Sequence, residues 1–293
     1  MLSLDQIHLF ITVVETGSFS ACARKLGKAQ SAISQGIANL ELDLNVTLFD
    51  RSTRIPSLTS DGKRLLPQAR AILMQAAEFE SAVVAVNKAE EPLIRVAVDS
   101  ALSYPRLWST LKRFSDTFPN TELELLECAS PDIHELLQNE RLDIGLVFSD
   151  VALKSALKIY LIGYVPFVAV CDPQHPLALA SDLDLSDLLL HREVVMRSQS
   201  QQVLQLLPPM SPKTWWADSF YQMRELIAAG VGWGYLPQPI AAEGLGNNEL
   251  HTIDLALDYK TWAAPADLVV TKSRTSGPAM QWLVAELKNL LDQ

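Results

Sequence analysis

A helix predicted to begin after Ala29 carries short polar side chains at helical spacing. One of its faces consists of hydroxyl, amide and methyl groups from Ser31, Ser34, Gln35 and Ala38. Another face is an apolar stripe made by Ile33, Ile37 and Leu40, which predicts inward packing on that side. Short hydroxyl and amide groups let a helix enter the major groove of DNA and hydrogen-bond to base edges. The alternative interpretation is a solvated helix face.

The elements around this helix would have to position it. Ser3 to Gln6 has the form of a capping box for a first helix, which ends at Gly17. Ser18 can cap a short second helix that Gly27 closes. After the third helix, residues 47–49 and 57–59 read as two strands joined by a turn that carries Arg51 and Arg54. The pattern predicts two helices and a third polar-faced helix followed by a hairpin.

These residues together resemble the LysR-type transcriptional regulators, which carry a winged helix-turn-helix. The matching positions, spread over about sixty residues, are Gly17 to Ala21, Leu26, Gln30 to Ser34, Leu40-Glu41, Leu48 to Arg51, Arg54, Leu58-Thr59 and Gly62. The resemblance implies that residues 1–60 bind double-stranded DNA. The implied DNA contacts are Gln30, Ser31, Ser34 and Gln35 in the major groove, with Arg51 and Arg54 on the wing.

Two features depart from the family pattern. Asn45 stands where the family usually has glycine, and asparagine tolerates the left-handed conformation that such a turn requires. The family often has basic residues near Gln35 and at position 57, and this chain has neither, which predicts few phosphate contacts. The formal net charge is -10, yet residues 1–70 hold eight Lys and Arg against six Asp and Glu. A mildly basic amino-terminal unit on an acidic body suggests different partners for the two parts.

A long helix is predicted over residues 61–90, capped by Thr59 or Ser60. Its apolar stripe is Leu65, Leu66, Ala69, Ile72, Leu73, Ala76, Phe79, Val83 and Val84. Pro67 lies inside it, and an interior proline removes one hydrogen bond and favours a bend. Stripes of this length generally bury against a partner. The resemblance implies a linker helix for homodimers, which can assemble into homotetramers on an interrupted inverted repeat.

Residues 91–293 alternate strands with helices, the order of an α/β domain with a largely parallel sheet. The resemblance supplies the topology, two lobes around a cleft as in type 2 periplasmic binding proteins. It implies one lobe of residues 91–163 and 267–293, and a second lobe of residues 164–266. The overall fold class expected is therefore α plus α/β: a winged helix-turn-helix domain, a linker helix and a two-lobed effector domain.

Open α/β sheets bind ligands beyond the carboxyl ends of their strands, where helix amino termini point their amides. The residues at such positions are Asp99, Ser100, Ala101, Ser130, Ser149, Arg197, Ser198, Asp218 and Phe220. Each could equally be a plain helix cap. Arg197 favours an anionic effector, whereas Asp99 and Asp218 favour a group that donates hydrogen bonds, and the sequence leaves the choice open.

Other function classes have less support in the sequence. There is no GxGxxG, HExxH or GxSxG motif, so no enzyme, metal or cofactor is expected. Neither a signal peptide nor a spanning helix is predicted, which favours a cytoplasmic regulator without membrane contact over an exported solute-binding protein. A redox-sensing regulator of the same family is an alternative, because Cys128 and Cys171 could lie near each other. A cytoplasmic small-molecule-binding protein is a weaker alternative.

Overall fold

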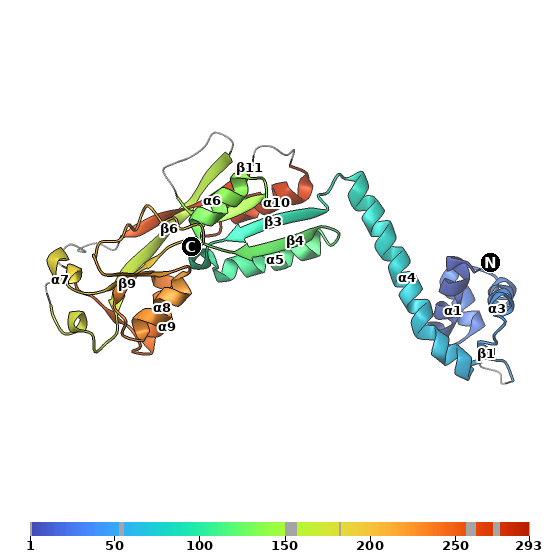
Figure 1. Cartoon of the computed structure of the whole chain (residues 1–293). Helices are drawn as coiled ribbons and strands as arrows, with labels where there is room; N and C mark the ends of the chain where they lie inside the picture. Colours follow the sequence, from blue (N-terminus) through green and yellow to red (C-terminus); the bar gives the residue numbers. More distant parts are fainter. Residues whose placement is uncertain are drawn as a thin grey trace. The chain divides into compact units, whose positions relative to one another are not determined.

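The computed structural model describes residues 2–52, 56–149, 157–181, 183–255, 262–271 and 276–292. It divides into two compact units, Met1–Lys88 and Ala89–Gln293. Figure 1 shows the elements of each.

The first unit begins with three short helices, α1 (Leu4–Thr16), α2 (Phe19–Leu26) and α3 (Gln30–Leu44). Its ends follow the sequence signals: Ser3 and Gln6 form the capping box, and the Ser18 hydroxyl accepts the Ala21 N–H. Gly17 and Gly27 adopt the left-handed conformation at the two helix ends. Asn45 does so after α3, with φ 51°, so the departure from glycine leaves the turn intact.

A two-stranded antiparallel wing follows, in which β1 (Phe49–Asp50) pairs with β2 (Ser57–Leu58). The core of the unit is formed by apolar residues of α1, α2 and α3 together with the start of the wing. Its fully buried side chains include Val13, Cys22, Ile33, Ile37 and Leu48. Phe49 lies edge-on to Phe10 and Phe19, with ring centroids 5.6 and 5.5 Å away. The wing is thereby packed against the helices.

Helix α4 (Ser60–Asn87) is continuous over 28 residues and includes Pro67. Its first half packs on the unit's own core through Leu65, Leu66, Ala69 and Leu73. The apolar side chains that it leaves exposed are Ile72, Met74, Phe79, Val83, Val84 and Val86. The predicted single stripe therefore divides into a packed part and an exposed part, and Leu73 belongs to the packed part.

The second unit contains a nine-stranded sheet in the described part of the chain. On one side, β3 (Leu93–Val98) lies between β4 (Glu122–Glu127) and β5 (Ile144–Phe148), all parallel. On the other, β7 (Glu193–Met196) lies between β8 (Thr214–Ala217) and β9 (Trp233–Pro237), also parallel. We call the parts built on these strand sets lobe one and lobe two.

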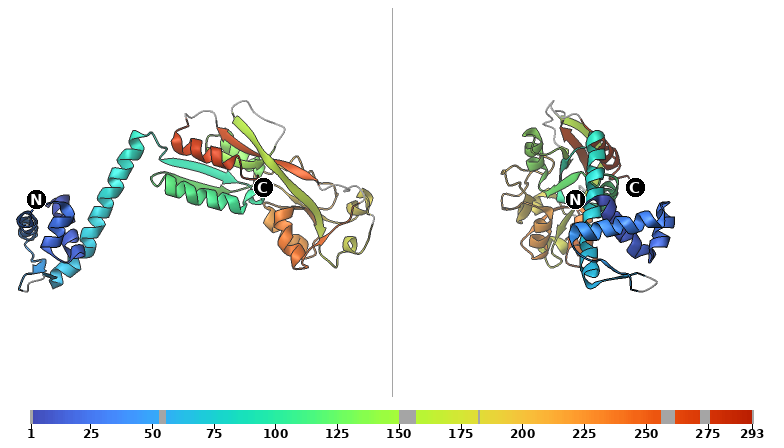
Figure 2. Two further views of the ribbon diagram at one scale, coloured as in Figure 1. Left: turned by 180° about the vertical axis from the view of Figure 1, so that it is seen from behind. Right: turned by 90° about the vertical axis from the view of Figure 1, so that its right-hand side faces the viewer.

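Two long strands join the lobes. They are β6 (Leu157–Cys171) and β11 (Ala263–Thr271), which pair antiparallel with each other. In lobe one β11 pairs with β5, and in lobe two β6 pairs with β9 and with β10 (His251–Thr252). Figure 2 shows both strands crossing the middle of this unit. The sheet is accordingly mixed, with the parallel sets at its two ends and antiparallel strands in its middle.

The pairing of β6 with β11 contains a bulge between Ala266 and Asp267. Opposite it lies Gly163, whose φ of +144° is a conformation that other residues rarely adopt. A Cβ atom at Gly163 would also lie 2.9 Å from the Cβ of Leu291. Backbone conformation and close packing both favour glycine at this crossing point.

Helices cover the sheet of each lobe. Lobe one carries α5 (Pro105–Thr117), α6 (Ser130–Gln138) and α10 (Pro278–Leu287), and the short 3-10 turn Ser100–Leu102 follows β3. Lobe two carries α7 (Leu185–Leu189), α8 (Phe220–Ala228) and α9 (Gln238–Gly246). Figure 1 shows α8 and α9 together beside β9. Strand β8 and helices α7 and α9 were not anticipated from the sequence.

Candidate functional site

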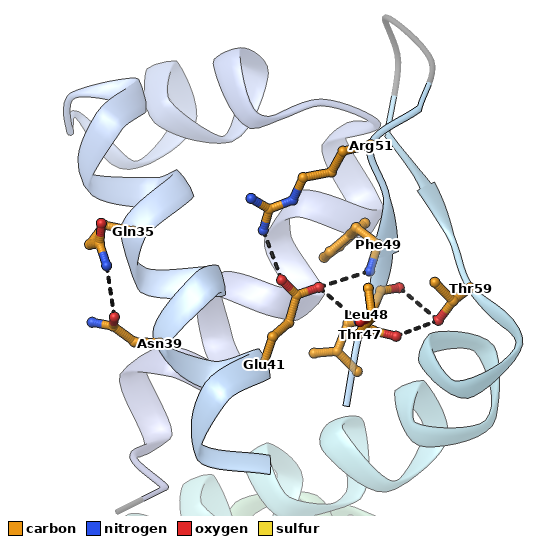
Figure 3. A network of polar contacts seen from close by, with 8 residues as sticks. All are labelled: Gln35, Asn39, Glu41, Thr47, Leu48, Phe49, Arg51 and Thr59. Carbon is orange, nitrogen blue, oxygen red and sulfur yellow. Dashed lines mark hydrogen bonds and ion pairs between the residues drawn. The ribbon is translucent and has the colours of Figure 1, made fainter. Parts of the chain in front are cut away.

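The polar face of α3 is open to solvent. Gln30, Ser31 and Gln35 are exposed and Ser34 is partly exposed. The Gln35 side-chain amide donates to Asn39 Oδ1 over 2.8 Å, as Figure 3 shows. Asn39 is exposed as well, and it extends the polar face by one turn. Asn39 was not among the predicted DNA contacts, although its i+4 spacing from Gln35 places it on the same helix face.

One predicted contact residue also connects two helices. The Ser20 hydroxyl of α2 donates to Oε1 of Gln30, 3.0 Å away, at the first residue of α3. The side-chain N–H groups of Gln30 remain for another acceptor. This bond fixes the start of α3 against α2, which is the geometric relation that a helix-turn-helix requires.

Glu41 near the end of α3 fastens the wing. Its Oε1 accepts the backbone N–H groups of Leu48 (2.7 Å) and Phe49 (3.0 Å), and its Oε2 accepts Arg51 Nη2 (2.8 Å). The Arg51 guanidinium also lies over the Phe19 ring, 5.4 Å from its centroid. Figure 3 shows the Glu41 contacts, and the Thr59 hydroxyl nearby donating to Thr47 O over 2.7 Å.

Arg51 is thus engaged inside the unit rather than extended from the wing. Arg54, the other wing arginine, lies outside the described residues. The positioning role of Glu41 was not predicted from the sequence. Its partners are seven to ten residues away along the chain and come into contact with it only after folding.

A cavity of about 110 Å³ opens between the lobes of the second unit. Lobe one supplies Ser100, Glu127, Cys128, Ala129 and Asp132 to its wall. Lobe two supplies Met196, Gln199, Asp218 and Ser219. Of the predicted effector contacts, the wall includes Ser100 and Asp218. Its charged members in the described part of the chain are all acidic, so the lining favours a cationic or hydrogen-bond-donating molecule.

Asp99 and Ser130 adjoin two residues of the cavity wall, Ser100 and Ala129, and are hydrogen-bonded to each other. Asp99 Oδ2 accepts the Ser130 N–H (2.9 Å) and hydroxyl (2.6 Å), and Oδ1 accepts the Ala101 N–H (3.2 Å). The Ser130 hydroxyl in turn accepts the Phe148 N–H over 2.9 Å. Burial raises the pKa of Asp99 to about 6 despite these hydrogen bonds. The pair connects the ends of β3 and β5 with the start of α6.

The remaining predicted effector residues lie outside the cavity wall. The Arg197 guanidinium stacks over Trp216, 4.6 Å from the ring centroid. The Ser198 hydroxyl pairs with that of Ser200 over 2.9 Å and accepts the Gln202 N–H. Phe220 is fully buried against other aromatic rings. Arg197 therefore gives little support to an anionic effector, because its guanidinium lies over an aromatic face and outside the cavity wall.

Ser149 lies at the end of β5, where its N–H donates to Pro265 O over 2.9 Å. Its side chain hydrogen-bonds to Asp267 on β11. Burial raises the pKa of Asp267, although this hydrogen bond acts in the opposite direction. Ser149 thus connects β5 with the crossing strand.

Asp132 in the first turn of α6 bridges the two lobes. Its carboxylate accepts the backbone N–H of Gln199 (2.9 Å) and that of Ser200 (3.1 Å), both of which belong to lobe two. Partial burial alone would raise the pKa of Asp132, yet hydrogen bonds from Ser200 and Gln199 hold it below its ordinary value. The sequence reading did not select Asp132, because a carboxylate in a first helical turn is common for helix stability alone.

Cys128 lines the interlobe cavity as a thiol. Burial and the nearby carboxylates of Asp132, Asp99 and Glu127 raise its pKa to about 11. Burial likewise raises the pKa of Cys171 to about 12. Because the thiolate is the form that reacts with oxidants, these surroundings disfavour peroxide sensing by either residue.

Comparison with known proteins identifies both units. The family model described as "Bacterial regulatory helix-turn-helix protein, lysR family" matches residues 4–63, and the "LysR substrate binding domain" model matches residues 87–292. The chain belongs to the LysR family. It is a transcriptional regulator with a helix-turn-helix DNA-binding domain and an effector-binding domain.

Curated LysR-family relatives cover most of the chain. The regulator AceR of Acinetobacter baumannii is 28% identical over 291 residues, 98% of this chain and 97% of AceR. The multiple virulence factor regulator MvfR of Pseudomonas aeruginosa is 31% identical over 249 residues, 85% of this chain and 74% of MvfR.

Solved LysR-family structures share the fold. CbnR matches with a TM-score of 0.55 at 20% identity, covering 98% of this chain and all of CbnR. The Corynebacterium glutamicum OxyR C206 mutant matches with a TM-score of 0.54 at 23% identity, covering 98% of this chain and 92% of that one. Within the described residues of this LysR-family chain, no helix is long and apolar enough to cross a membrane.

Proposed function

We propose that this regulator reads its DNA site with the exposed face of α3, through Gln30, Ser31, Ser34 and Gln35. The observation that carries the proposal is the combination of an open amide-and-hydroxyl face with a wing fastened to the same helix by Glu41. Amide side chains in the major groove recognise adenine by paired hydrogen bonds. Asn39 lies on the same face and completes the reading surface.

The two wing arginines have different proposed roles. Arg51 positions the wing through Glu41 and Phe19, and Arg54 contacts the phosphate backbone or minor groove. A contact to phosphate carries no sequence information of its own. Losing Arg54 should therefore weaken specific and random DNA equally, whereas losing a reading residue should weaken mainly the specific site.

The active species is proposed to be a homodimer, or a homotetramer of two such dimers, on an interrupted inverted repeat. Helix α4 supports this, since Phe79 is 72% exposed and Val86 77% exposed on one isolated chain. Contiguous apolar side chains left in water are typical of an interface. A two-fold dimer matches two inverted half-sites and gains affinity from holding both at once. Such a protein acts in the cytoplasm, where DNA is accessible.

The effector is proposed to bind in the interlobe cavity. The contacts we assign are Ser100 and Asp218 together with Glu127 and Gln199, while Asp99, Ala101 and Ser130 shape the floor. The residues assigned to a structural role outside the cavity wall are Arg197, Ser198, Ser149 and Phe220. An acidic lining of this size suits a small amine or another compact hydrogen-bond donor. Asp132 hydrogen-bonds lobe one to lobe two, so a ligand bound beside it would shift the equilibrium between arrangements of the two lobes. If those arrangements differ in DNA affinity, the ligand changes DNA binding.

The DNA proposal is tested with a site obtained by selection from random duplexes using the full-length protein. Gln35→Ala should weaken that site by about 1–3 kcal/mol and a scrambled duplex much less. Gln205→Ala replaces an exposed glutamine of lobe two and serves as the matched control. Equal losses on both duplexes would refute the reading role.

The effector proposal is tested by thermal shift with panels of small amines, amino acids and carboxylates. A ligand at 100 times its dissociation constant adds about 2.7 kcal/mol of stability. An amine whose stabilisation disappears in Asp218→Asn, and persists in Asp187→Asn on α7, supports the acidic cavity. A carboxylate hit that is indifferent to Asp218→Asn would refute the assignment.

A further inference from the structure

Lobe two contains a second, larger cavity of about 260 Å³ that is separate from the interlobe opening. It lies among β7, the segment that follows it, α8 and β9. Its wall is formed by Glu193 to Met196, Leu204, Leu206, Leu207, Pro208, Met210, Phe220, Met223, Tyr235 and Trp262. Met196 belongs to the walls of both cavities.

The wall of this lobe-two cavity is predominantly apolar and is held by aromatic packing. The Phe220 ring lies 5.6 Å from Phe167, and Phe167 lies 5.0 Å from Trp262, measured between ring centroids. A cavity of about 150 Å³ lined by apolar side chains binds benzene. The larger volume here therefore accommodates a fused two-ring molecule. Rigid apolar walls recognise such a molecule by shape.

A single carboxyl group interrupts the apolar wall. Glu193 is only 4% exposed, and its Oε2 accepts the N–H groups of Met210 and Ser211, each over 2.7 Å. Burial raises the pKa of Glu193. These two hydrogen bonds fix the carboxyl in the wall. A fixed acceptor in an apolar site selects for a ligand with a hydrogen-bond donor, since an unpaired polar group there is costly.

We propose that the lobe-two cavity is a binding site for an uncharged planar aromatic molecule that carries one hydrogen-bond donor. The proposal goes beyond the interlobe effector site and does not depend on it. Met196 lines both cavities, so a molecule bound in lobe two would lie next to a residue of the interlobe wall.

The probes are 2-naphthol and naphthalene, which have the same two rings and differ by one hydroxyl. Their binding to the full-length protein is followed by competition and calorimetry at neutral pH. Both should bind saturably, with 2-naphthol preferred by about tenfold, the ratio that corresponds to about 1.4 kcal/mol for one additional hydrogen bond. Absence of saturable binding by both probes overturns the proposal.

Three variants locate the binding. Leu206→Trp fills the cavity and should weaken both probes at least about tenfold, whereas Leu179→Trp, at an exposed position of lobe two outside the cavity, should leave both unchanged. Glu193→Gln keeps an acceptor for the backbone N–H groups but lacks the charge. It should retain naphthalene and lose most of the preference for 2-naphthol. Probe binding that survives Leu206→Trp, or a preference unaffected by Glu193→Gln, refutes the site.

Discussion

Replacing Glu41 with alanine should detach the wing from α3. The resulting loss of unfolding free energy can be worked out from the contacts of Glu41. The change leaves the N–H groups of Leu48 and Phe49 without their acceptor, and those residues are 0% and 3% exposed. An unsatisfied buried donor costs about 1–3 kcal/mol, so the pair costs about 2–6 kcal/mol. The ion pair with Arg51 adds at most about 1 kcal/mol, because the Arg51 side chain is 45% exposed.

Two optical signals distinguish unfolding of the first unit from unfolding of the second. All six tryptophans lie between residues 108 and 282, so tryptophan fluorescence reports only on the second unit. Far-UV circular dichroism also records the helices of the first unit. In urea, Glu41→Ala should shift the dichroism transition of the helical unit to lower concentration and leave the fluorescence transition in place.

Three variants separate the contribution of the two backbone hydrogen bonds from that of the ion pair with Arg51. Glu41→Gln keeps an acceptor for the two N–H groups and should lose less stability than Glu41→Ala, and Arg51→Ala should lose least. Glu15→Ala removes only an exposed ion pair with Lys25 and is the control. The explanation fails if Glu41→Ala destabilises the first unit no more than Glu15→Ala does.

Three further predictions concern other parts of the chain. Burial raises the pKa of Asp99 from its ordinary value of 3.8 to about 6 in the folded protein, so the stability that this carboxyl contributes is full below pH 4 and falls by about 3 kcal/mol between pH 4 and pH 6; the unfolding free energy of Asp99→Asn, measured against pH, should lack this fall. Asp132→Ala should speed hydrogen exchange at the Gln199 and Ser200 amides about tenfold, since both lose their acceptor, while Glu135→Ala on the exposed side of α6 should not. Phe79→Glu should shift sedimentation toward the monomer, whereas Ala77→Glu, about 200° around α4, should not; equal behaviour would place the interface elsewhere.

Local signals allowed most of the first unit to be predicted. Ser3, Ser18, Gly17 and Gly27 act at helix ends as their types predict, since caps depend on residues within one turn. The amphipathic face of α3 is likewise a property of spacing alone. The wing's attachment was not predictable in this way, because Glu41 meets backbone groups that only the fold brings to it.

The candidate effector site was predictable in position but less so in composition. The ends of parallel strands do converge between the lobes, and Ser100 and Asp218 lie in the cavity wall. The sequence could not show that Asp99 and Ser130 satisfy each other, or that Arg197 stacks on Trp216, because these pairings join separate segments. Trp216 lies on β8, whose four residues are too few for a period-two pattern to be distinct.

The bulged crossing of β6 and β11 has a mechanical consequence. These strands are hydrogen-bonded to each other along most of their length, and each is also paired to a neighbour within one lobe. A two-stranded ribbon bends and twists more readily than it stretches, and Gly163 and the bulge at Ala266 lie where its ladder is interrupted. We therefore expect one lobe to move against the other mainly by rotation about that point. Effectors of unrelated chemistry would then act on the DNA-binding unit through the same few rotations of the lobes.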